Sequence, residues 1–126
     1  MKDFRNLKVW EKSHNLVLDI YNITKVFPKV ELYGLTSQIR RAAISIPTNI
    51  SEGCGRSNGK DFARFMQIAM GSASELEYLI FLSSELKLIE NPIYSDLNLK
   101  VIEIKKMLIS LMQKLRTDGW KLNSKS

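Results

Sequence analysis

The chain has 126 residues, of which 44% are hydrophobic and 25% are charged, as expected for one soluble domain with a substantial core. Its single cysteine, Cys54, excludes an internal disulfide and favours a reducing, cytoplasmic location, and no apolar run approaches the roughly 18 residues of a membrane span. The net charge of +6 favours polyanionic partners.

The first predicted element is a helix over residues 6–27, which Pro28 would end. Its apolar residues form two stripes about 120° apart, where a single stripe would be enough to dock a helix on a core. One stripe comprises Leu7, Trp10, Val17 and Tyr21, and the other Val9, Leu16, Ile20, Ile23 and Phe27. The surplus stripe predicts a second buried surface, and we assign Trp10 to core packing.

A second helix is predicted over residues 35–53. Its core face follows three- and four-residue steps through Leu35, Ile39, Ala42, Ile46 and Ile50. Pro47 lies within this helix, lacks an amide donor and crowds the carbonyl of Ala43, so we expect a kink there. A complete break is the alternative, but the apolar stripe continues in phase beyond the proline.

A third helix is predicted over residues 59–87, with Asn58 as its N-cap and Asp61 in its first turn. A fourth is predicted over residues 92–117, where Asn91 precedes a proline at the first helical position. Its apolar side chains alternate at three- and four-residue steps, which is typical of bundle packing: Tyr94, Leu97, Val101, Ile104, Leu108, Leu111 and Leu115.

These elements predict an all-α fold, an up-down-up-down antiparallel four-helix bundle with helix two kinked at Pro47. Short connections between long helices favour antiparallel neighbours. We expect the bundle to occupy residues 1–117 and the polar residues 118–126 to form a C-terminal tail.

The segment around Gly59-Lys60 does not fit a nucleotide-binding loop. A phosphate loop needs a glycine five positions earlier, where Cys54 stands, and a dinucleotide fingerprint needs a glycine at Asn58. The two Ser-x-x-Lys matches lack companion motifs, and His14 is the sole histidine, so the chain cannot supply the two Glu-x-x-His pairs of a di-metal site. We therefore expect no enzyme, cofactor or metal site.

Basic residues gather on the second helix and at the start of the third, where phosphate contacts are one interpretation and a solvated surface is the other. The candidates for nucleic-acid contact are Arg40, Arg56, Lys60 and Arg64, with Lys105 and Lys106 on the fourth helix as secondary candidates.

Arg41 and Glu52 share a polar stripe of the second helix. They lie three turns apart, about 16 Å, which is too far for pairing within one helix. We expect them to meet their partners across a subunit interface or to face solvent.

Several segments resemble a known family. They are FRNLKVWEKSHNLVLDIYNIT, FPKVELYGLTSQIRRAAISIPTNISEGCGR, FARFMQIAMGSASELEYLI and LKLIE, which together extend over about residues 4–115. The chain resembles the four-helix bundle proteins encoded in intervening sequences of bacterial 23S ribosomal RNA genes, with His14 where alanine is usual.

The resemblance implies a four-helix bundle and kinship with the accessory proteins of diversity-generating retroelements. Those accessory proteins form five-membered barrels and bind nucleic acid alongside a reverse transcriptase. The resemblance therefore implies a homopentamer, and it would account for the surplus apolar stripe of the first helix.

Our leading hypothesis is a non-enzymatic, oligomeric protein that binds RNA or DNA through backbone phosphates without strong sequence preference. No aromatic platform for reading bases is expected. One alternative is a scaffold that docks an acidic protein partner, such as a reverse transcriptase or an RNA-processing factor. The other is a product of an inserted element with no essential partner.

Overall fold

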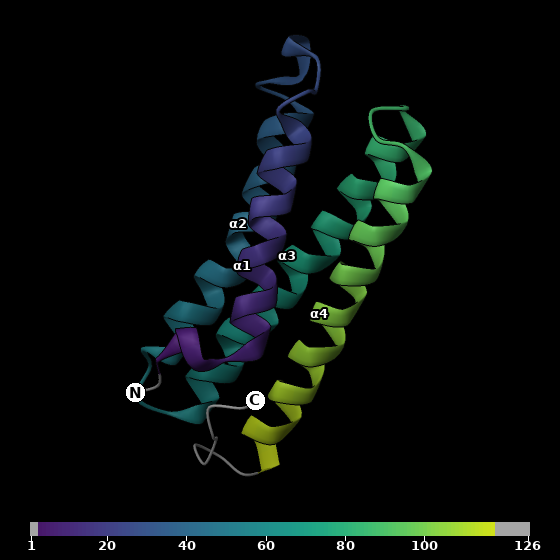
Figure 1. Cartoon of the computed structure of the whole chain (residues 1–126). Coiled ribbons are helices and arrows are strands. Elements are labelled where there is room, and N and C mark those ends of the chain that lie inside the picture. Colours follow the sequence, from purple (N-terminus) through teal and green to yellow (C-terminus); the bar gives the residue numbers. More distant parts are fainter. Residues whose placement is uncertain (1–2, 118–126) are drawn as a thin grey trace.

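The computed structural model describes residues 3–117 and contains four α-helices joined by short connections. The helices are α1 (Lys8–Thr24), α2 (Leu35–Cys54), α3 (Gly59–Glu85) and α4 (Asn91–Thr117), with 3-10 turns η1 (Phe4–Asn6) and η2 (Lys29–Glu31). Each helix packs against the next in the chain, and successive helices run in opposite directions (Figure 1). No β-strand occurs within residues 3–117. The all-α four-helix bundle is therefore confirmed.

The core is built from the apolar faces that the sequence periodicity indicates. On α4, the side chains at three- and four-residue steps are buried from Leu97 through Leu115. On α1, one stripe is buried (Val9, Leu16, Ile20), whereas the other is only partly covered, with Trp10 and Val17 half-buried and Tyr21 exposed. The surplus apolar surface of α1 thus lies at the outside of the single chain.

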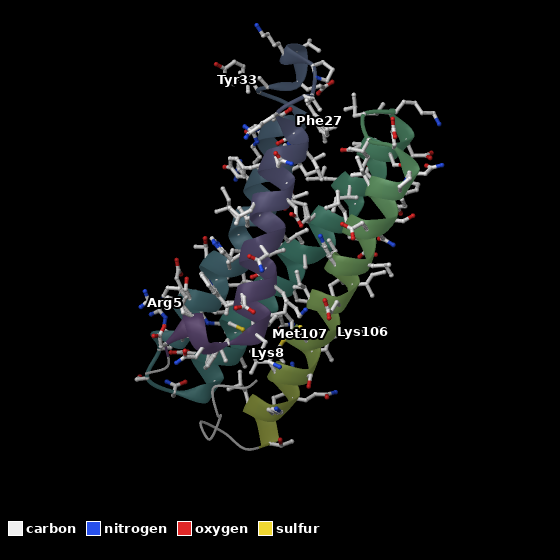
Figure 2. The ribbon with its side chains drawn as sticks, viewed as in Figure 1. Arg5, Lys8, Phe27, Tyr33, Lys106 and Met107 are labelled. Carbon is white, nitrogen blue, oxygen red and sulfur yellow. The ribbon has the colours of Figure 1, made fainter. Side chains whose placement is uncertain are left out.

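α1 ends at Thr24, three residues before the expected end at Phe27. Pro28 disfavours helical geometry at the residue before it, and the Thr24 hydroxyl donates a hydrogen bond to the Ile20 carbonyl at 2.7 Å. The segment between α1 and α2 projects beyond the bundle, with Tyr33 pointing outward at its tip (Figure 2).

The start of α3 is capped as expected, because the Asn58 side chain accepts a hydrogen bond from the Asp61 amide at 2.8 Å. The helix ends at Glu85, two residues early, in a pair of closing hydrogen bonds. The Leu88 amide donates to the Ser83 carbonyl and the Lys87 amide to the Ser84 carbonyl. Lys87 accordingly adopts φ = 64°, a left-handed conformation that glycine usually occupies.

α2 continues as one helix through Pro47, so the chain does not break there. Pro47 is buried. The kink that its missing amide predicts is still a prediction. The expected tail over residues 118–126 lies outside the described part of the chain.

α1 and α4 border a groove that charged side chains bridge. Lys100 Nζ lies 2.8 Å from an Asp19 oxygen and 3.0 Å from an Asp96 oxygen, and Lys12 lies 3.4 Å from Glu103. The hydrogen bonds that Lys100 donates to Asp19 and, with a smaller effect, to Asp96 raise the pKa of Lys100 above its ordinary value. Two adjoining pockets of about 260 and 290 Å³, which share Asp19 and Lys100, follow this groove.

Candidate nucleic-acid interface

Two arginines share one aromatic ring where α2 turns into α3. α2 ends at Cys54, which leaves Arg56 in the turn, while Arg64 lies in the second turn of α3. The guanidinium carbon of Arg56 is 4.6 Å from the centre of the Phe65 ring, and that of Arg64 is 5.1 Å from it. Phe65 is only 7% exposed, so the core holds the ring that both cations contact.

We define the basic corner as Arg56, Lys60 and Arg64. All three side chains are exposed. Within residues 3–117 none of them forms an ion pair, although Glu52 and Asp61 are close in sequence. The corner therefore presents three positive charges that this part of the chain leaves uncompensated.

The other candidates for nucleic-acid contact lie away from the basic corner. Arg40 stacks on Tyr21 at 4.6 Å and donates from Nε to the Thr24 hydroxyl at 2.8 Å, so it ties α2 to α1. Cys54, the last residue of α2, is 14 residues farther along the chain, so Arg40 lies about 21 Å along the helix axis from the turn that carries Arg56. Arg40 thus has a structural role in this chain.

Lys105 and Lys106 differ in their surroundings. Lys105 Nζ donates to a Glu77 carboxylate oxygen at 2.7 Å, and both side chains are partly buried. Lys106 is exposed, points away from the bundle in Figure 2, and makes no ion pair with the described residues. Of the two, only Lys106 keeps its charge available.

Arg41 and Glu52 are both exposed on the outer face of α2, and neither makes an ion pair within residues 3–117. Small polar side chains border this face, where the Ser45 and Ser72 hydroxyls hydrogen-bond at 2.7 Å between α2 and α3. The geometry leaves both charges available for contacts outside the chain.

An aromatic cluster that the sequence analysis missed lies beside η1. The rings of Trp10 and His14 are parallel, with an angle of 5° and centroids 4.9 Å apart, and the Phe4 ring is tilted against Trp10. Trp10 is only half-buried and His14 is exposed, so core packing alone does not describe Trp10. The sequence could have indicated this cluster, because the four-residue spacing of Trp10 and His14 puts both side chains on one helix face.

The described residues contain no group of three His, Cys, Asp or Glu side chains arranged to hold a metal ion. Among the same residues, no helix is both long and apolar enough to cross a membrane.

The comparisons with known proteins agree on one family. A crystal structure of a protein of unknown function from the S23 ribosomal protein family of Bacteroides thetaiotaomicron is 30% identical, with a TM-score of 0.77. The match covers 83% of this chain and 98% of that one. A search of curated proteins finds no match. The model of the 23S rRNA-intervening sequence protein family matches residues 5–110, and the chain therefore belongs to that family.

Proposed function

We propose that this protein is a non-enzymatic, cytoplasmic RNA- or DNA-binding protein that contacts backbone phosphates through its basic corner, without strong sequence preference. The observation that carries the proposal is the pair of guanidinium groups held on Phe65, with which no carboxylate of residues 3–117 forms an ion pair. Lys106 is a secondary contact in this proposal. Lys105 is not, because Glu77 already holds its ammonium group.

Stacking on Phe65 explains why these arginines suit phosphates. A ring that contacts the guanidinium plane leaves the N–H groups at its edges free to donate to phosphate oxygens. The ring also limits the side-chain motion that binding would otherwise have to arrest. A phosphate backbone offers the same oxygens at every nucleotide, so contacts of this kind carry no sequence information.

We further propose that the protein acts as a homo-oligomer, with a ring of five as the form that the family resemblance implies. Arg41 and Glu52 are exposed and make no ion pair within residues 3–117, which supports subunit contacts on the outer face of α2. In a ring, Arg41 would meet Glu52 of one neighbouring copy, and Glu52 would meet Arg41 of the other neighbour. Five copies at +6 each would carry a formal charge of +30, which would strengthen attraction to a polyanion.

A second candidate function is a scaffold that docks a protein, such as a reverse transcriptase or an RNA-processing factor with an acidic surface. The connection between α1 and α2 favours it, because Val26, Val30 and Tyr33 are 82%, 87% and 94% exposed. Such apolar exposure on one projection is typical of contact surfaces. A pull-down that survives nuclease treatment would favour the scaffold over direct nucleic-acid binding.

The deciding experiment is fluorescence anisotropy of a labelled structured RNA and a labelled DNA duplex over a series of salt concentrations. The variant Arg56→Gln/Lys60→Gln/Arg64→Gln removes the basic corner. The control Lys25→Gln/Lys29→Gln/Lys87→Gln removes the same charge from the connections at the opposite end of the bundle (Figure 1).

For the duplex, we expect the slope of log affinity against log salt to fall by up to about 2.7 in the corner variant, at ~0.9 per lost phosphate contact. The control should keep most of the slope. Unchanged affinity in the corner variant, with circular dichroism showing an intact fold, would refute the proposal. Absence of binding to either probe at low salt would also refute it and would favour the scaffold.

A further inference from the structure

The connection between α1 and α2 presents an apolar surface that the described part of the chain leaves uncovered. We define the knob as Lys25, Val26, Lys29, Val30, Leu32 and Tyr33. Its apolar side chains are all exposed, and Tyr33 points outward at the tip (Figure 2). Apolar exposure concentrated on a projecting segment is typical of a surface that contacts another molecule.

The knob has a fixed shape. Phe27 at its base is only 8% exposed, and the Leu32 amide donates a hydrogen bond to the Lys29 carbonyl at 3.1 Å. The Glu31 carboxylate accepts a hydrogen bond from the Leu35 amide at 3.3 Å, which ties the knob to the start of α2. A surface that is shaped before binding loses less conformational entropy when it docks.

A second exposed apolar surface lies on the C-terminal part of α3. We define the patch as Tyr78, Phe81, Leu82, Glu85 and Leu86, which share one helix face. Tyr78, Phe81 and Leu86 are 58%, 48% and 52% exposed. The Phe81 ring packs edge-on against Tyr94 of α4, with centroids 6.4 Å apart, which holds it in place. Figure 1 shows the knob and the C-terminal end of α3 at the same end of the bundle.

The two surfaces carry complementary charges. Lys25 and Lys29 are exposed on the knob, Glu85 is exposed within the patch, and Glu90 is exposed beside it. None of these four side chains forms an ion pair within residues 3–117. Unpaired lysines on one apolar surface and unpaired glutamates on the other are the arrangement that favours contact between the two.

Each surface also carries one charge of the opposite sign. Glu31 on the knob is half-buried and already accepts the Leu35 amide, and Lys87 is exposed beside the patch. Two lysines still outnumber one glutamate on the knob, and two glutamates outnumber one lysine at the patch. Within one chain both surfaces are exposed, so the match is between the knob of one copy and the patch of another.

We propose that the knob of one copy docks on the patch of a second copy, with the knob's lysines beside the patch's glutamates. The inference rests on the homo-oligomer of the proposed function and supplies it with a head-to-tail contact. Because the knob and the patch lie at the same end of the bundle, successive copies stand side by side, as a closed ring requires. The contact uses none of the charged residues of the α2 interface, and the basic corner lies at the opposite end (Figure 1).

The apolar side chains hold this contact together, and the charges select the partner. Charges across an interface govern specificity and association rate more than affinity. Neutralising Lys25 and Lys29 with glutamine should therefore change assembly by only a few-fold, so the control for the basic corner keeps its oligomer. Glu85→Lys places like charges together and should weaken assembly, and Lys25→Glu/Lys29→Glu in the same chain should restore it.

Sedimentation velocity over a series of protein concentrations tests the contact. Val30→Ser/Tyr33→Ser removes the knob's apolar tip at positions that are 87% and 94% exposed, and Tyr78→Ser/Leu86→Ser removes the patch. Each variant should raise the concentration at which half of the protein is assembled by at least about ten-fold. Circular dichroism should show an intact fold in both, because all four positions are exposed.

A matched control and a mixture make the test specific. Leu99→Ser/Ile109→Ser removes two exposed apolar side chains from α4, outside both surfaces, and should assemble as the wild type does. The knob variant keeps its patch and the patch variant keeps its knob. An equal mixture of the two should therefore form pairs of twice the 14.5 kDa of one chain, at concentrations where each variant alone is monomeric.

The outcomes separate this contact from the proposed function. A wild type that assembles, together with knob and patch variants that assemble equally well, would overturn the contact and leave the homo-oligomer standing. Variants that lose assembly without forming pairs in the mixture would show that the knob meets a different surface, and would also overturn it. A wild type that is monomeric at every concentration would overturn both the contact and the homo-oligomer, while phosphate binding by the basic corner is decided separately by anisotropy.

Discussion

Gly53 and Gly71 are both helical glycines, and alanine at the two positions should have opposite effects on stability. In an open helical position, Gly→Ala stabilises a protein by about 0.5–1 kcal/mol, because alanine loses less backbone entropy on folding. A Cβ at Gly71 would meet no atom within 4 Å. We therefore expect Gly71→Ala to raise the free energy of unfolding by that amount.

Gly53 lies where α2 and α3 approach closely. A Cβ there would lie 2.8 Å from Met66 Cε, 3.0 Å from Phe65 Cβ and 3.1 Å from Phe62 Cδ1. The methionine end can move, but Phe65 Cβ is fixed to the α3 backbone, so the helices must separate slightly. Such overpacking costs about 1–3 kcal/mol, which equals or exceeds the propensity gain.

The free energies of unfolding of Gly53→Ala and Gly71→Ala should thus differ by about 1–3 kcal/mol, with Gly71→Ala the more stable. Urea and thermal denaturation followed by circular dichroism would measure this, at roughly 3–5 °C in Tm for each kcal/mol at this chain length. Equal stability of the two variants would refute the argument that the α2–α3 contact leaves no room. Because Phe65 also holds Arg56 and Arg64, Gly53→Ala should weaken phosphate binding as well.

Three further predictions concern local features. The hydroxyl of Thr36 is buried and has no hydrogen-bond partner within residues 3–117, so Thr36→Val should raise the free energy of unfolding in urea by about 1 kcal/mol. Lys87→Gly should also stabilise, by about 1 kcal/mol in the same assay, since glycine adopts the left-handed conformation without strain. The pKa of Lys100 is raised above 10.5, so its contribution to stability is present below that pH and is lost as the pH rises through the folded-state pKa. The difference in free energy of unfolding between the wild type and Lys100→Met should therefore shrink as the pH is raised. A difference that stays constant would contradict the stabilisation of the Lys100 ammonium by Asp19 and Asp96.

The fold could be predicted because its determinants are local and periodic. The apolar stripe of α4 and the Asn58 cap of α3 are readable from neighbouring residues, and both are confirmed. The sequence analysis expected α1 to end at Phe27 instead of Thr24. A pattern of apolar residues does not show that the Thr24 hydroxyl donates a hydrogen bond to the Ile20 carbonyl. The left-handed conformation of Lys87 could not be predicted, because glycine is the residue that usually indicates such a turn.

The candidate site was less accessible to sequence reasoning, because charge pairing depends on residues distant in the chain. Lys105 and Lys106 look alike in sequence, yet the first is held by Glu77, which is 28 residues away on another helix. The sharing of Phe65 by Arg56 and Arg64 likewise depends on how the turn folds back on α3. A residue type shows that a charge exists, whereas only the tertiary structure shows whether it is already neutralised.

The polar contacts between α1 and α4 bear on which helix separates first from the bundle in local unfolding. α2 and α3 meet largely through buried apolar side chains, whereas partly exposed ion pairs of Lys12 and Lys100 span the α1–α4 side of the bundle. Local unfolding should therefore begin with α1, and its amides should exchange with solvent before those of α2 and α3. Salt screens exposed charges, so raising the ionic strength should speed exchange in α1 and leave the α2–α3 pair unaffected.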